Sequence, residues 1–493
     1  LERRHVLGGA AVTEEVFPGF KFSVCSYVVS LMKSNVMREL MLPKFGLELL
    51  PLESTLTPLE DDYIIRTADP DQTYREIARH SKKDAENYMR FGPAMGQIGM
   101  SVRPVLETIA PNAIRPSLSD LSATKKLLNH VKTLSSEQFE YLTKLMTMSS
   151  ADFLDEWFEY EPLKATMSAS GIIGTFMGPR SPGSAYVMLH HYMGDIDGAF
   201  RAWGFQRGGT GAVSMAIARS AEHFGVDIMT EASVEKVMVK NGRATGVVLE
   251  NGDEYNSKMV ISGLDPKLSF LKMLDEKDLP SDFVTAIKNF RIRGSSGKVN
   301  LALDALPNFT CLPGDGHHHR GAISISPSYD HLENAYDDAK YGNFSRAPFM
   351  DIILPSVLDP DMAPPGKHVM SCFVQYAPYD IKGGWNDQKR EDFGNAVINT
   401  IARYAPNIKD IILHRQVLTP ADLESTFGLT EGNIFHGELT LQQLFSLRPA
   451  VKWADYTTPI KNYFQCGSGT HPGGGITGSP GEMAAKKILG TWK

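Results

Sequence analysis

The stretch Lys461-Asn-Tyr-Phe-Gln-Cys-Gly-Ser-Gly-Thr-His-Pro-Gly-Gly-Gly-Ile-Thr-Gly478-Ser-Pro-Gly-Glu-Met-Ala-Ala-Lys-Lys487 decides the fold of this chain. Tyr463 to Cys466 is a short apolar run that predicts a buried strand. From about Gly474 the spacing of the apolar residues Ile476, Met483, Ala484 and Ile488 predicts a helix. The order strand, glycine-rich turn, helix indicates an α/β protein.

The six glycines between Gly467 and Gly478 leave backbone N–H groups and the positive end of the predicted helix open to a ligand. Such a surface suits a large, flat, anionic ligand. Glycine-rich turns of this kind are also common in α/β proteins without a ligand. The stretch does not fit the dinucleotide fingerprint GxGxxG, because Pro472 stands where the third glycine belongs.

Composition excludes several classes of protein. Of 493 residues, 50 are Lys or Arg and 57 are Asp or Glu, which gives a net charge of −7 and no basic tract suited to nucleic acid. No apolar run is long enough to span a bilayer, so we expect at most peripheral contact with a membrane. The four cysteines lie far apart in the sequence, which argues against a disulfide framework, a zinc site and a dithiol centre, and favours a reducing compartment.

The beginning of the sequence, Leu1-Glu-Arg-Arg-His-Val-Leu-Gly-Gly-Ala10, predicts a strand end, an acid and a tight glycine turn. In a dinucleotide-binding βαβ unit, an acid about 20 residues after the glycine-rich loop accepts hydrogen bonds from the ribose. Glu2 stands where that acid is expected. A solvated glutamate at a strand end explains the same residue.

Taken together, Glu2-x5-Gly8-Gly9 and Gly467-x2-Thr-His-Pro-Gly-Gly-Gly-Ile476 resemble the flavin-dependent phytoene desaturase and amine oxidase superfamily. The resemblance implies an FAD cofactor and a discontinuous FAD-binding βαβ (Rossmann-like) domain with an interleaved α+β substrate domain. The cofactor-binding residues that it implies are Glu2, Arg3, Gly8, Gly9, Val234, Gly263, Gly467, Ser468, Thr470, His471, Pro472, Gly473, Gly474, Gly475 and Ile476.

Two departures from the family pattern weaken this expectation. The family's first strand, GxGxxG turn and helix should precede Glu2, so we expect roughly 30 or more residues of that unit to lie outside the given sequence. Without them the chain loses the main helix N-terminus for the flavin pyrophosphate. Ala10 stands where family members typically carry an arginine.

The resemblance divides the chain into interleaved segments. We assign residues 1–34, 204–268 and 446–493 to the FAD-binding domain, and residues 35–203 and 269–445 to the substrate domain. Periodicity predicts helices at 73–97, 135–158, 211–223 and 385–404, and strands at 226–230, 234–239, 244–249, 259–263, 291–303, 319–325, 349–354 and 368–376.

Four groups within the insertions could carry chemistry. Lys298 in Gly294-Ser-Ser-Gly-Lys298 is similar to the amine oxidase lysine that holds a water beside the flavin, although a strand lysine is more often solvated. His317-His318-His319 follow a turn and predict a surface loop rather than a metal site. Asp152, Asp155 and Glu156 predict a solvated acidic face. His436 and Glu438 could line a cavity, or Glu438 could support a helix from about Thr440.

We therefore expect an FAD-dependent oxidoreductase that removes a hydride equivalent from a C–H or C–N bond of an apolar or amphipathic small molecule. The alternative is a non-catalytic flavin-fold protein that acts as a regulatory or interaction subunit. A dithiol reductase is disfavoured by the isolated cysteines. The resemblance also implies a location in the mitochondrial matrix.

Overall fold

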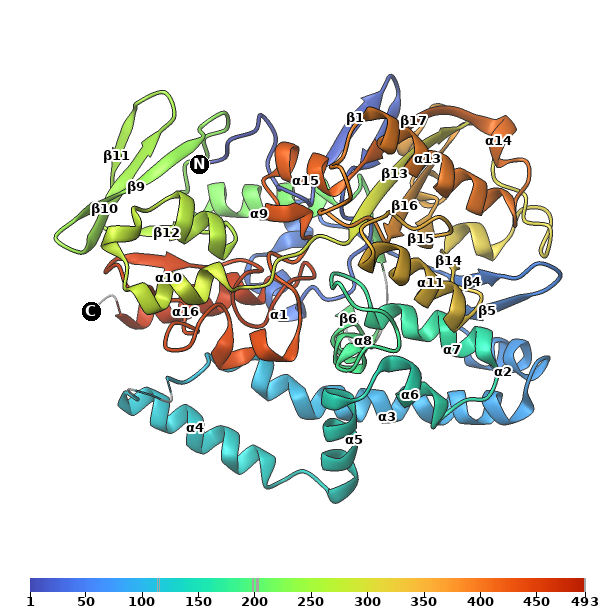
Figure 1. Cartoon of the computed structure of the whole chain (residues 1–493), viewed down its shortest axis with the longest axis horizontal. Helices are drawn as coiled ribbons and strands as arrows, with labels where there is room; N and C mark the ends of the chain where they lie inside the picture. Colours follow the sequence, from blue (N-terminus) through green and yellow to red (C-terminus); the bar gives the residue numbers. More distant parts are fainter. Residues whose placement is uncertain (113, 115, 197–198, 201–203, 492–493) are drawn as a thin grey trace.

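The computed structural model describes residues 1–491 apart from 113, 115, 197, 198 and 201–203 (Figure 1). Its helices are α1 Ser34–Glu39, α2 Pro70–Ala78, α3 Lys82–Leu106, α4 Leu118–Val131, α5 Ser136–Thr147, α6 Ser150–Asp155, α7 Glu161–Ser168, α8 Ser184–Tyr192, α9 Gly211–His223, α10 Ser281–Lys288, α11 Tyr329–Lys340, α12 Pro355–Leu358, α13 Asp387–Ala402, α14 Ile408–Ile411, α15 Pro420–Phe427 and α16 Ser479–Thr491. Its strands are β1 Thr13–Phe17, β2 Phe20–Ser23, β3 Leu49–Pro51, β4 Ser54–Pro58, β5 Tyr63–Thr67, β6 Asp195–Ile196, β7 Ala199–Phe200, β8 Gly204–Gln206, β9 Val234–Lys240, β10 Arg243–Leu249, β11 Glu254–Asn256, β12 Val260–Ser262, β13 Ser296–Leu303, β14 Ala322–Ile325, β15 Phe349–Ile353, β16 His368–Gln375, β17 Ile412–Leu418 and β18 Tyr463–Gln465.

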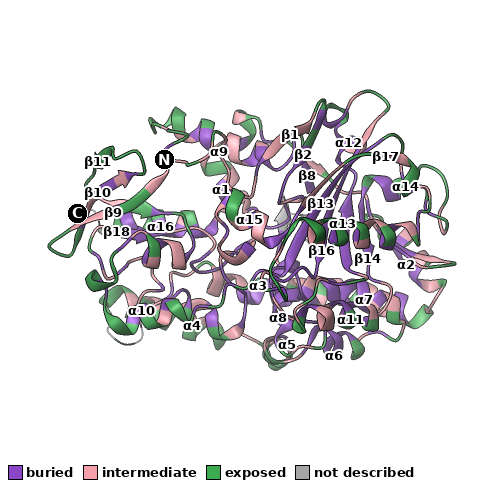
Figure 2. Cartoon of the chain, turned by 45° about the horizontal axis from the view of Figure 1, so that its top comes forward, coloured by how far each residue is buried: buried purple, intermediate pink, exposed green. Residues whose placement is uncertain are grey.

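A seven-stranded sheet in the order β17-β13-β16-β15-β14-β4-β5 forms the larger half of the molecule, on the right of Figure 1. Its pairs are antiparallel except for the parallel pair β14–β4. Strands β13 and β16 are buried along nearly their whole length, as Figure 2 shows. The mixed sheet with helices against it confirms the predicted α/β class.

Successive side chains of β16 point to opposite faces of the sheet, and each face packs into a separate hydrophobic core. Val369 and Phe373 face one side of the sheet and pack with residues of α7, α8 and α11. Met370, Cys372 and Val374 face the other side and pack against α13. The first face also carries the buried polar residues Lys298 and Asp351.

The other half contains the parallel pair β12–β18, the three-stranded sheet β11-β10-β9 and the helices α9, α10 and α16 (Figure 1). Because β12 and β18 are parallel, their carboxyl ends lie at the same edge, where α/β folds bind ligands. The predicted strands at 259–263 and 463–466, the hairpin and the helix at 211–223 are therefore confirmed.

Several predicted elements were wrong in detail. The helix predicted from Gly474 begins only at Ser479, because Gly475, Ile476 and Gly478 adopt positive φ. No strand forms at 226–230; backbone groups of Met229, Glu231 and Ala232 bond instead to residues 2–4. The helix predicted from about Thr440 is only a 3₁₀ turn, Leu441–Gln443.

Two predicted long helices are each broken by a serine cap. The segment 73–97 divides between α2 and α3, because Ser81 accepts a hydrogen bond from the N–H of Asp84. The segment 135–158 divides between α5 and α6, where Ser149 caps Asp152 in the same way. Serine is a strong N-cap residue, so each break was encoded locally.

The domain boundaries stay predictions. Residues 201–203, at the end of the first predicted insertion, lie outside the described residues. That insertion is mainly helical as expected, but it also supplies β4 and β5 to the large sheet. In the described part of the chain, no helix has the length and apolar character needed to cross a membrane.

Candidate cofactor and active site

The glycine-rich loop 467–478 starts at the carboxyl edge of β12 and β18. The edge brings Gly263 and Gly467 together, since a Cβ on Gly467 would lie 2.8 Å from the carbonyl oxygen of Gly263. Thr470 closes the first turn by donating its N–H and its hydroxyl to the Gly467 carbonyl, at 3.1 and 2.9 Å. These predicted site residues thus form one structural unit.

The carbonyl groups of this loop are held by the protein interior. Arg448 donates to the carbonyls of Ser468 and Thr470, at 2.8 and 3.2 Å. The Tyr456 hydroxyl donates to the carbonyl of His471 at 2.8 Å, and Nε2 of His190 lies 3.1 Å from the carbonyl of Gly474. A trans peptide points its N–H opposite to its carbonyl, so Gly469, His471 and Gly475 turn their N–H groups away from these partners.

The backbone N–H groups of the loop are correspondingly free. Among the described residues, no acceptor binds the N–H of Gly469, His471, Gly473, Gly474, Gly475 or Ile476. Several of these residues are buried, and an unpaired buried N–H group costs free energy unless it gains a partner. The loop therefore fits the carbonyl oxygens and ring nitrogens of a bound anionic or electron-rich ring system.

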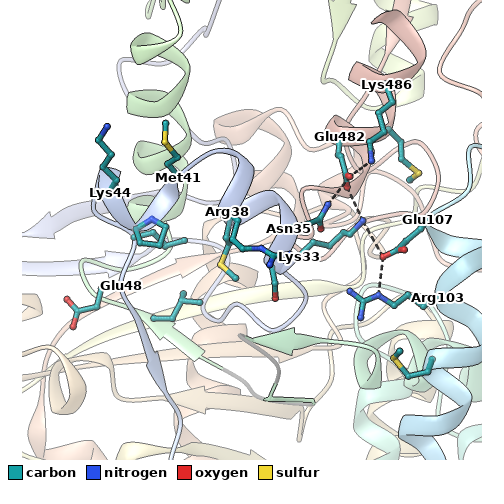
Figure 3. A pocket seen from close by; sticks show the side chains of 17 residues that line it. Lys33, Asn35, Arg38, Met41, Lys44, Glu48, Arg103, Glu107, Glu482 and Lys486 are labelled. Carbon is teal, nitrogen blue, oxygen red and sulfur yellow. Dashed lines mark hydrogen bonds and ion pairs between the residues drawn. The ribbon is translucent and has the colours of Figure 1, made fainter. Parts of the chain in front are cut away.

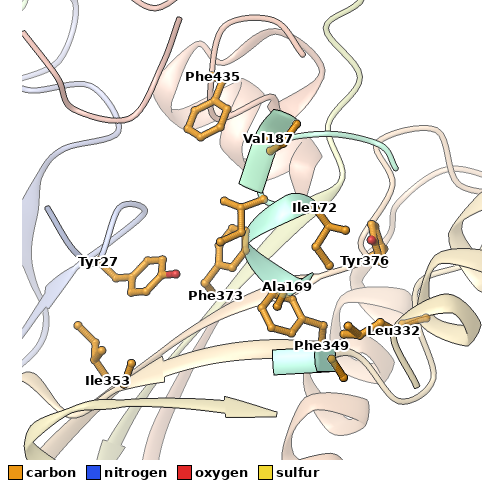
Figure 4. Close-up of a cluster of buried hydrophobic side chains, with 14 of the residues drawn as sticks. Tyr27, Ala169, Ile172, Val187, Leu332, Phe349, Ile353, Phe373, Tyr376 and Phe435 are labelled. Atoms are coloured by element: carbon orange, nitrogen blue, oxygen red, sulfur yellow. The ribbon is translucent and has the colours of Figure 1, made fainter. Parts of the chain in front are cut away.

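Three glycines of the loop have no room for a side chain. A Cβ on Gly473, Gly474 or Gly475 would lie 2.6, 2.4 or 2.4 Å from Leu439, Phe435 or Leu31, respectively. Phe435 fills the space between the loop and α8, as its position beside Val187 in Figure 4 indicates. These glycines are needed for packing as well as for any close approach of a ligand.

The histidines around the loop are neutral. Burial lowers the pKa of His190 to about 3 and that of His471 to about 4. Nδ1 of His190 is buried without a hydrogen-bond partner. A neutral imidazole in this position can donate or accept a proton in a hydrogen bond, but it adds no charge.

Two cavities share a wall formed by Lys33, Arg103 and Glu107, and the smaller of the two reaches the loop. The larger, about 1350 Å³, lies between α1, the C-terminal part of α3 and α16 (Figure 3). Its charged lining consists of Lys33, Arg38, Lys44, Arg103 and Lys486 with Glu48, Glu107 and Glu482. The smaller, about 100 Å³, is lined by His190, Pro472 and Thr477, by apolar side chains, and by the polar side chains Lys33, Ser34, Arg103, Glu107 and Ser479.

The larger cavity has a cationic excess. Figure 3 shows Lys33 between Glu482 and Glu107, with N–O distances of 2.9 and 3.4 Å. Arg38 and Lys44 have no carboxylate partner among the described residues. Unpaired cations at a cavity wall suit the phosphates of a nucleotide.

Lys298 lies on the sheet face that carries Phe373 and Asp351. The register places Lys298, Phe373 and Asp351 in one row across β13, β16 and β15. Lys298 is only 2% exposed, so the predicted solvated alternative is wrong. Its Nζ has no hydrogen-bond partner among the described residues and lies 4.8 Å from the Tyr27 ring centroid. Burial lowers the pKa of Lys298 to about 8.

Tyr27 joins this row from the N-terminal segment. Its ring stacks on Phe373 with centroids 5.6 Å apart, as the close-up in Figure 4 shows. Its hydroxyl donates to Oδ2 of Asp351 at 3.0 Å. Burial raises the pKa of Asp351 to about 6, against the opposing effect of this hydrogen bond. Sequence reasoning missed Tyr27 and Asp351, because no local motif marks either residue.

The N-terminal candidates lie in a separate group. The backbone of Glu2 pairs with Met229 and Ala232, and its carboxylate accepts from the N–H of Arg4 at 2.8 Å. Arg3 donates to the carbonyls of Ser425 and Thr426, at the end of α15. None of their described hydrogen bonds reaches the loop 467–476.

The predicted glycine turn and Val234 lie near this group. Gly8 and Gly9 both have positive φ, and a Cβ on Gly8 would lie 2.6 Å from the Ser214 hydroxyl on α9. Val234 begins β9. The turn therefore packs against the start of α9, as a tight glycine turn requires.

The remaining candidates have structural surroundings. His318 and His319 are buried in a 3₁₀ turn, so the predicted surface loop was wrong for both. The described residues contain no group of three or more side chains suited to a metal ion. Glu438 is buried and accepts hydrogen bonds from Nε and Nη2 of Arg293, at 2.8 and 2.9 Å. Asp152, Asp155 and Glu156 are exposed, as predicted.

Comparison with known proteins identifies the family, although no protein-family model matches the chain. The chain is 40% identical to pyridine nucleotide-disulfide oxidoreductase domain-containing protein 2 of Rattus norvegicus, over 99% of this chain and 88% of that protein. It is 25% identical to a lycopene-forming phytoene desaturase of Paracoccus sp., over 84% of this chain and 76% of the desaturase. A putrescine oxidase redesigned in its cofactor binding shares the fold, with a TM-score of 0.59, 13% identity and coverage of 99% and 92%. The chain therefore belongs to the family of pyridine nucleotide-disulfide oxidoreductase domain-containing protein 2 and has the fold of the phytoene desaturase and amine oxidase superfamily.

Proposed function

We propose that this protein is an FAD-dependent oxidoreductase that removes a hydride equivalent from a C–H or C–N bond of an apolar or amphipathic small molecule. The observation that carries this proposal is the loop 467–476: the protein interior holds several of its carbonyls, and six of its N–H groups have no acceptor among the described residues. FAD would supply the electron-accepting chemistry when bound. The oxidoreductase family supports the same reaction class.

Residues of five segments would hold the cofactor. The N–H groups of Gly473 to Ile476 would bind the ring system, and Gly263 would leave room beside the same edge. Arg38 and Lys44 would neutralise phosphate oxygens in the larger cavity. Glu2, Gly8, Gly9 and Val234 keep their predicted roles toward the adenosine end.

Lys298 is the best candidate for proton handling in the substrate region. A lysine with a pKa of about 8 can release or take up a proton near neutral pH, whereas an exposed lysine cannot. Tyr27 fixes the position of the amine, and Phe373 fixes Tyr27. Because Nζ has no hydrogen-bond partner in the part of the chain that the structure describes, it could bond to a water or a substrate atom.

The buried apolar side chains near Lys298 favour an apolar substrate. Phe373, Tyr27, Ile172 and Phe349 belong to one buried cluster (Figure 4). Oδ2 of Asp351 accepts a hydrogen bond from Tyr27, and the carboxyl group is buried. These surroundings favour a substrate that is neutral at the reacting end.

The cysteines do not support a dithiol reaction. Burial raises the pKa of Cys25 and Cys372 to about 12 and that of Cys466 to about 11. Thiols with such pKa values carry almost no thiolate at neutral pH. Reduction of a disulfide by thiol-blocked protein would contradict the assignment of the chemistry to flavin alone.

An absorbance spectrum of the purified protein tests the proposal. Flavin bands near about 370 and 450 nm that disappear on addition of an oxidisable substrate would support it. Purified protein that takes up no FAD, even with FAD in excess, would favour the non-catalytic interaction or regulatory role. Fractionation of cells that express the full-length protein would test the proposed mitochondrial matrix location.

A further inference from the structure

Arg448 is a completely buried cation without an anionic partner. Its exposed fraction is 0%, and it forms no ion pair among the described residues. In the described part of the chain, every hydrogen bond of its guanidinium group goes to a backbone carbonyl: those of Phe435, Gly437, Glu438, Gln443, Ser468 and Thr470. A buried charge without a counter-ion is expensive, so its retention calls for a specific explanation.

The six carbonyls belong to two different segments of the chain. Four lie in residues 435–443, which follow α15, and two lie in the glycine-rich loop. Arg448 therefore joins these segments through a single planar group with five N–H donors. A lysine at this place has three donors on one nitrogen and cannot reach all of these carbonyls.

The charge lies directly beneath the loop. A Cβ on Gly473 would be 3.9 Å from Nε of Arg448. The field of Arg448 also contributes to the lowered pKa values of His190, His436 and His471, which surround the loop. The positive charge of Arg448 therefore acts on the side chains that surround the loop.

We propose that Arg448 is the positioning residue of the cofactor loop. It orients the peptide groups 468–471 so that their N–H groups face the ligand, and its uncompensated charge stabilises negative charge that develops on the bound ring system. This inference rests on the proposed FAD site, but the loop geometry can be tested without the cofactor.

Three variants separate the two roles. Arg448→Lys keeps the charge and loses most of the carbonyl bonds. Arg448→Met loses both. Tyr456→Phe removes the hydroxyl that donates to the His471 carbonyl and leaves the charge in place, so it is the matched control for loosening of the loop.

Amide hydrogen exchange of the cofactor-free full chain tests the positioning role. We expect faster exchange over both 435–443 and 467–472 in Arg448→Lys, and over the second segment only in Tyr456→Phe. Unchanged exchange in Arg448→Lys would overturn the positioning role. This measurement stays decisive if the protein binds no FAD, an outcome that would refute only the proposed function.

The redox equilibrium of the FAD-loaded protein tests the electrostatic role. We expect a roughly tenfold shift toward the oxidised form in Arg448→Met, which is about 30 mV for a two-electron couple. Arg448→Lys and Tyr456→Phe should hold FAD more weakly but keep the wild-type midpoint. Equal midpoints in wild type and Arg448→Met would overturn the electrostatic role. If Arg448→Met does not fold, a wild-type midpoint in Arg448→Gln would do the same.

Discussion

The hydroxyl of Tyr27 donates a 3.0 Å hydrogen bond to the carboxylate of Asp351, although 324 residues separate them in the sequence. The same tyrosine ring lies under the amine of Lys298. A phenol, a carboxylate and an amine thus share one buried face of the large sheet. Their surroundings make the stability of the protein depend on pH in two opposite ways.

Replacement of Asp351 by asparagine should remove one of these dependences. The pKa of Asp351 is about 6 in the folded protein against 3.8 for the unperturbed group, so the folded state binds more protons between these values. Wild-type stability therefore falls as the pH rises from 4 to 6, by up to about 3 kcal/mol. Asp351→Asn keeps an acceptor for Tyr27. Its free energy of unfolding, measured in urea, should change less with pH over this range. If the free energy of unfolding of the variant changed with pH as much as that of the wild type, Asp351 would not be the buried carboxyl that titrates in this range.

Replacement of Lys298 by methionine should stabilise the protein and slow its chemistry. The pKa of Lys298 is about 8 when folded and 10.5 when unperturbed, so the folded state binds fewer protons in between. Wild-type stability rises with pH across this window, and Lys298→Met should gain up to about 3 kcal/mol at pH 7, a gain lost by pH 10.

Stopped-flow measurement of the rate at which bound flavin is reduced tests the functional effect of Lys298→Met. We expect a slower rate in Lys298→Met and loss of the inflection near pH 8, with FAD content unchanged. Lys340→Met, on the surface helix α11, is the control. Identical rate profiles in Lys298→Met and wild type would show that Lys298 has only a structural role.

Replacement of Gly474 by aspartate should abolish flavin retention. The new side chain would place a negative charge beside the loop, and its Cβ would collide with Phe435, which packs within 2.4 Å of that position. Gly474→Ala separates these effects, since it adds only the collision, at a cost of about 1–3 kcal/mol. The double variant Gly474→Ala with Phe435→Ala should recover part of this stability and bind FAD better than Gly474→Asp. Undiminished FAD in Gly474→Asp would show that the loop is not the site.

Loss of Arg293 should leave the buried carboxylate of Glu438 without a partner. We expect Arg293→Met to lower the free energy of unfolding by about 2–3 kcal/mol, because the half-exposed arginine is removed from a carboxylate that is itself 0% exposed. The double variant Arg293→Met with Glu438→Gln should recover most of the lost free energy of unfolding. Arg346→Met, whose side chain is 85% exposed in its pair with Asp338, should cost at most about 1 kcal/mol. Equal losses for Arg293→Met and Arg346→Met would mean that Glu438 is solvated.

Local patterns in the sequence predicted much of the architecture. The apolar run at 463–466, the Asn-Gly turn between β9 and β10, and the strands predicted at 349–354 and 368–376 formed nearly as expected, whereas those predicted at 291–303 and 319–325 begin only at Ser296 and Ala322. Signals of this kind depend on neighbours within a few residues, so they are readable without tertiary information. The serine caps at Ser81 and Ser149 belong to the same class and could have located two helix breaks.

The glycine-rich loop and Lys298 were determined as candidates by the sequence itself, because their residue types and spacing carry the family resemblance. Only the tertiary structure decided how the loop presents its N–H groups, which depends on Arg448, Tyr456 and His190. It also decided that Tyr27 and Asp351 meet at Lys298 and that β4 and β5 complete the large sheet. These contacts join distant segments through burial and hydrogen bonds, and no periodicity along the chain encodes them.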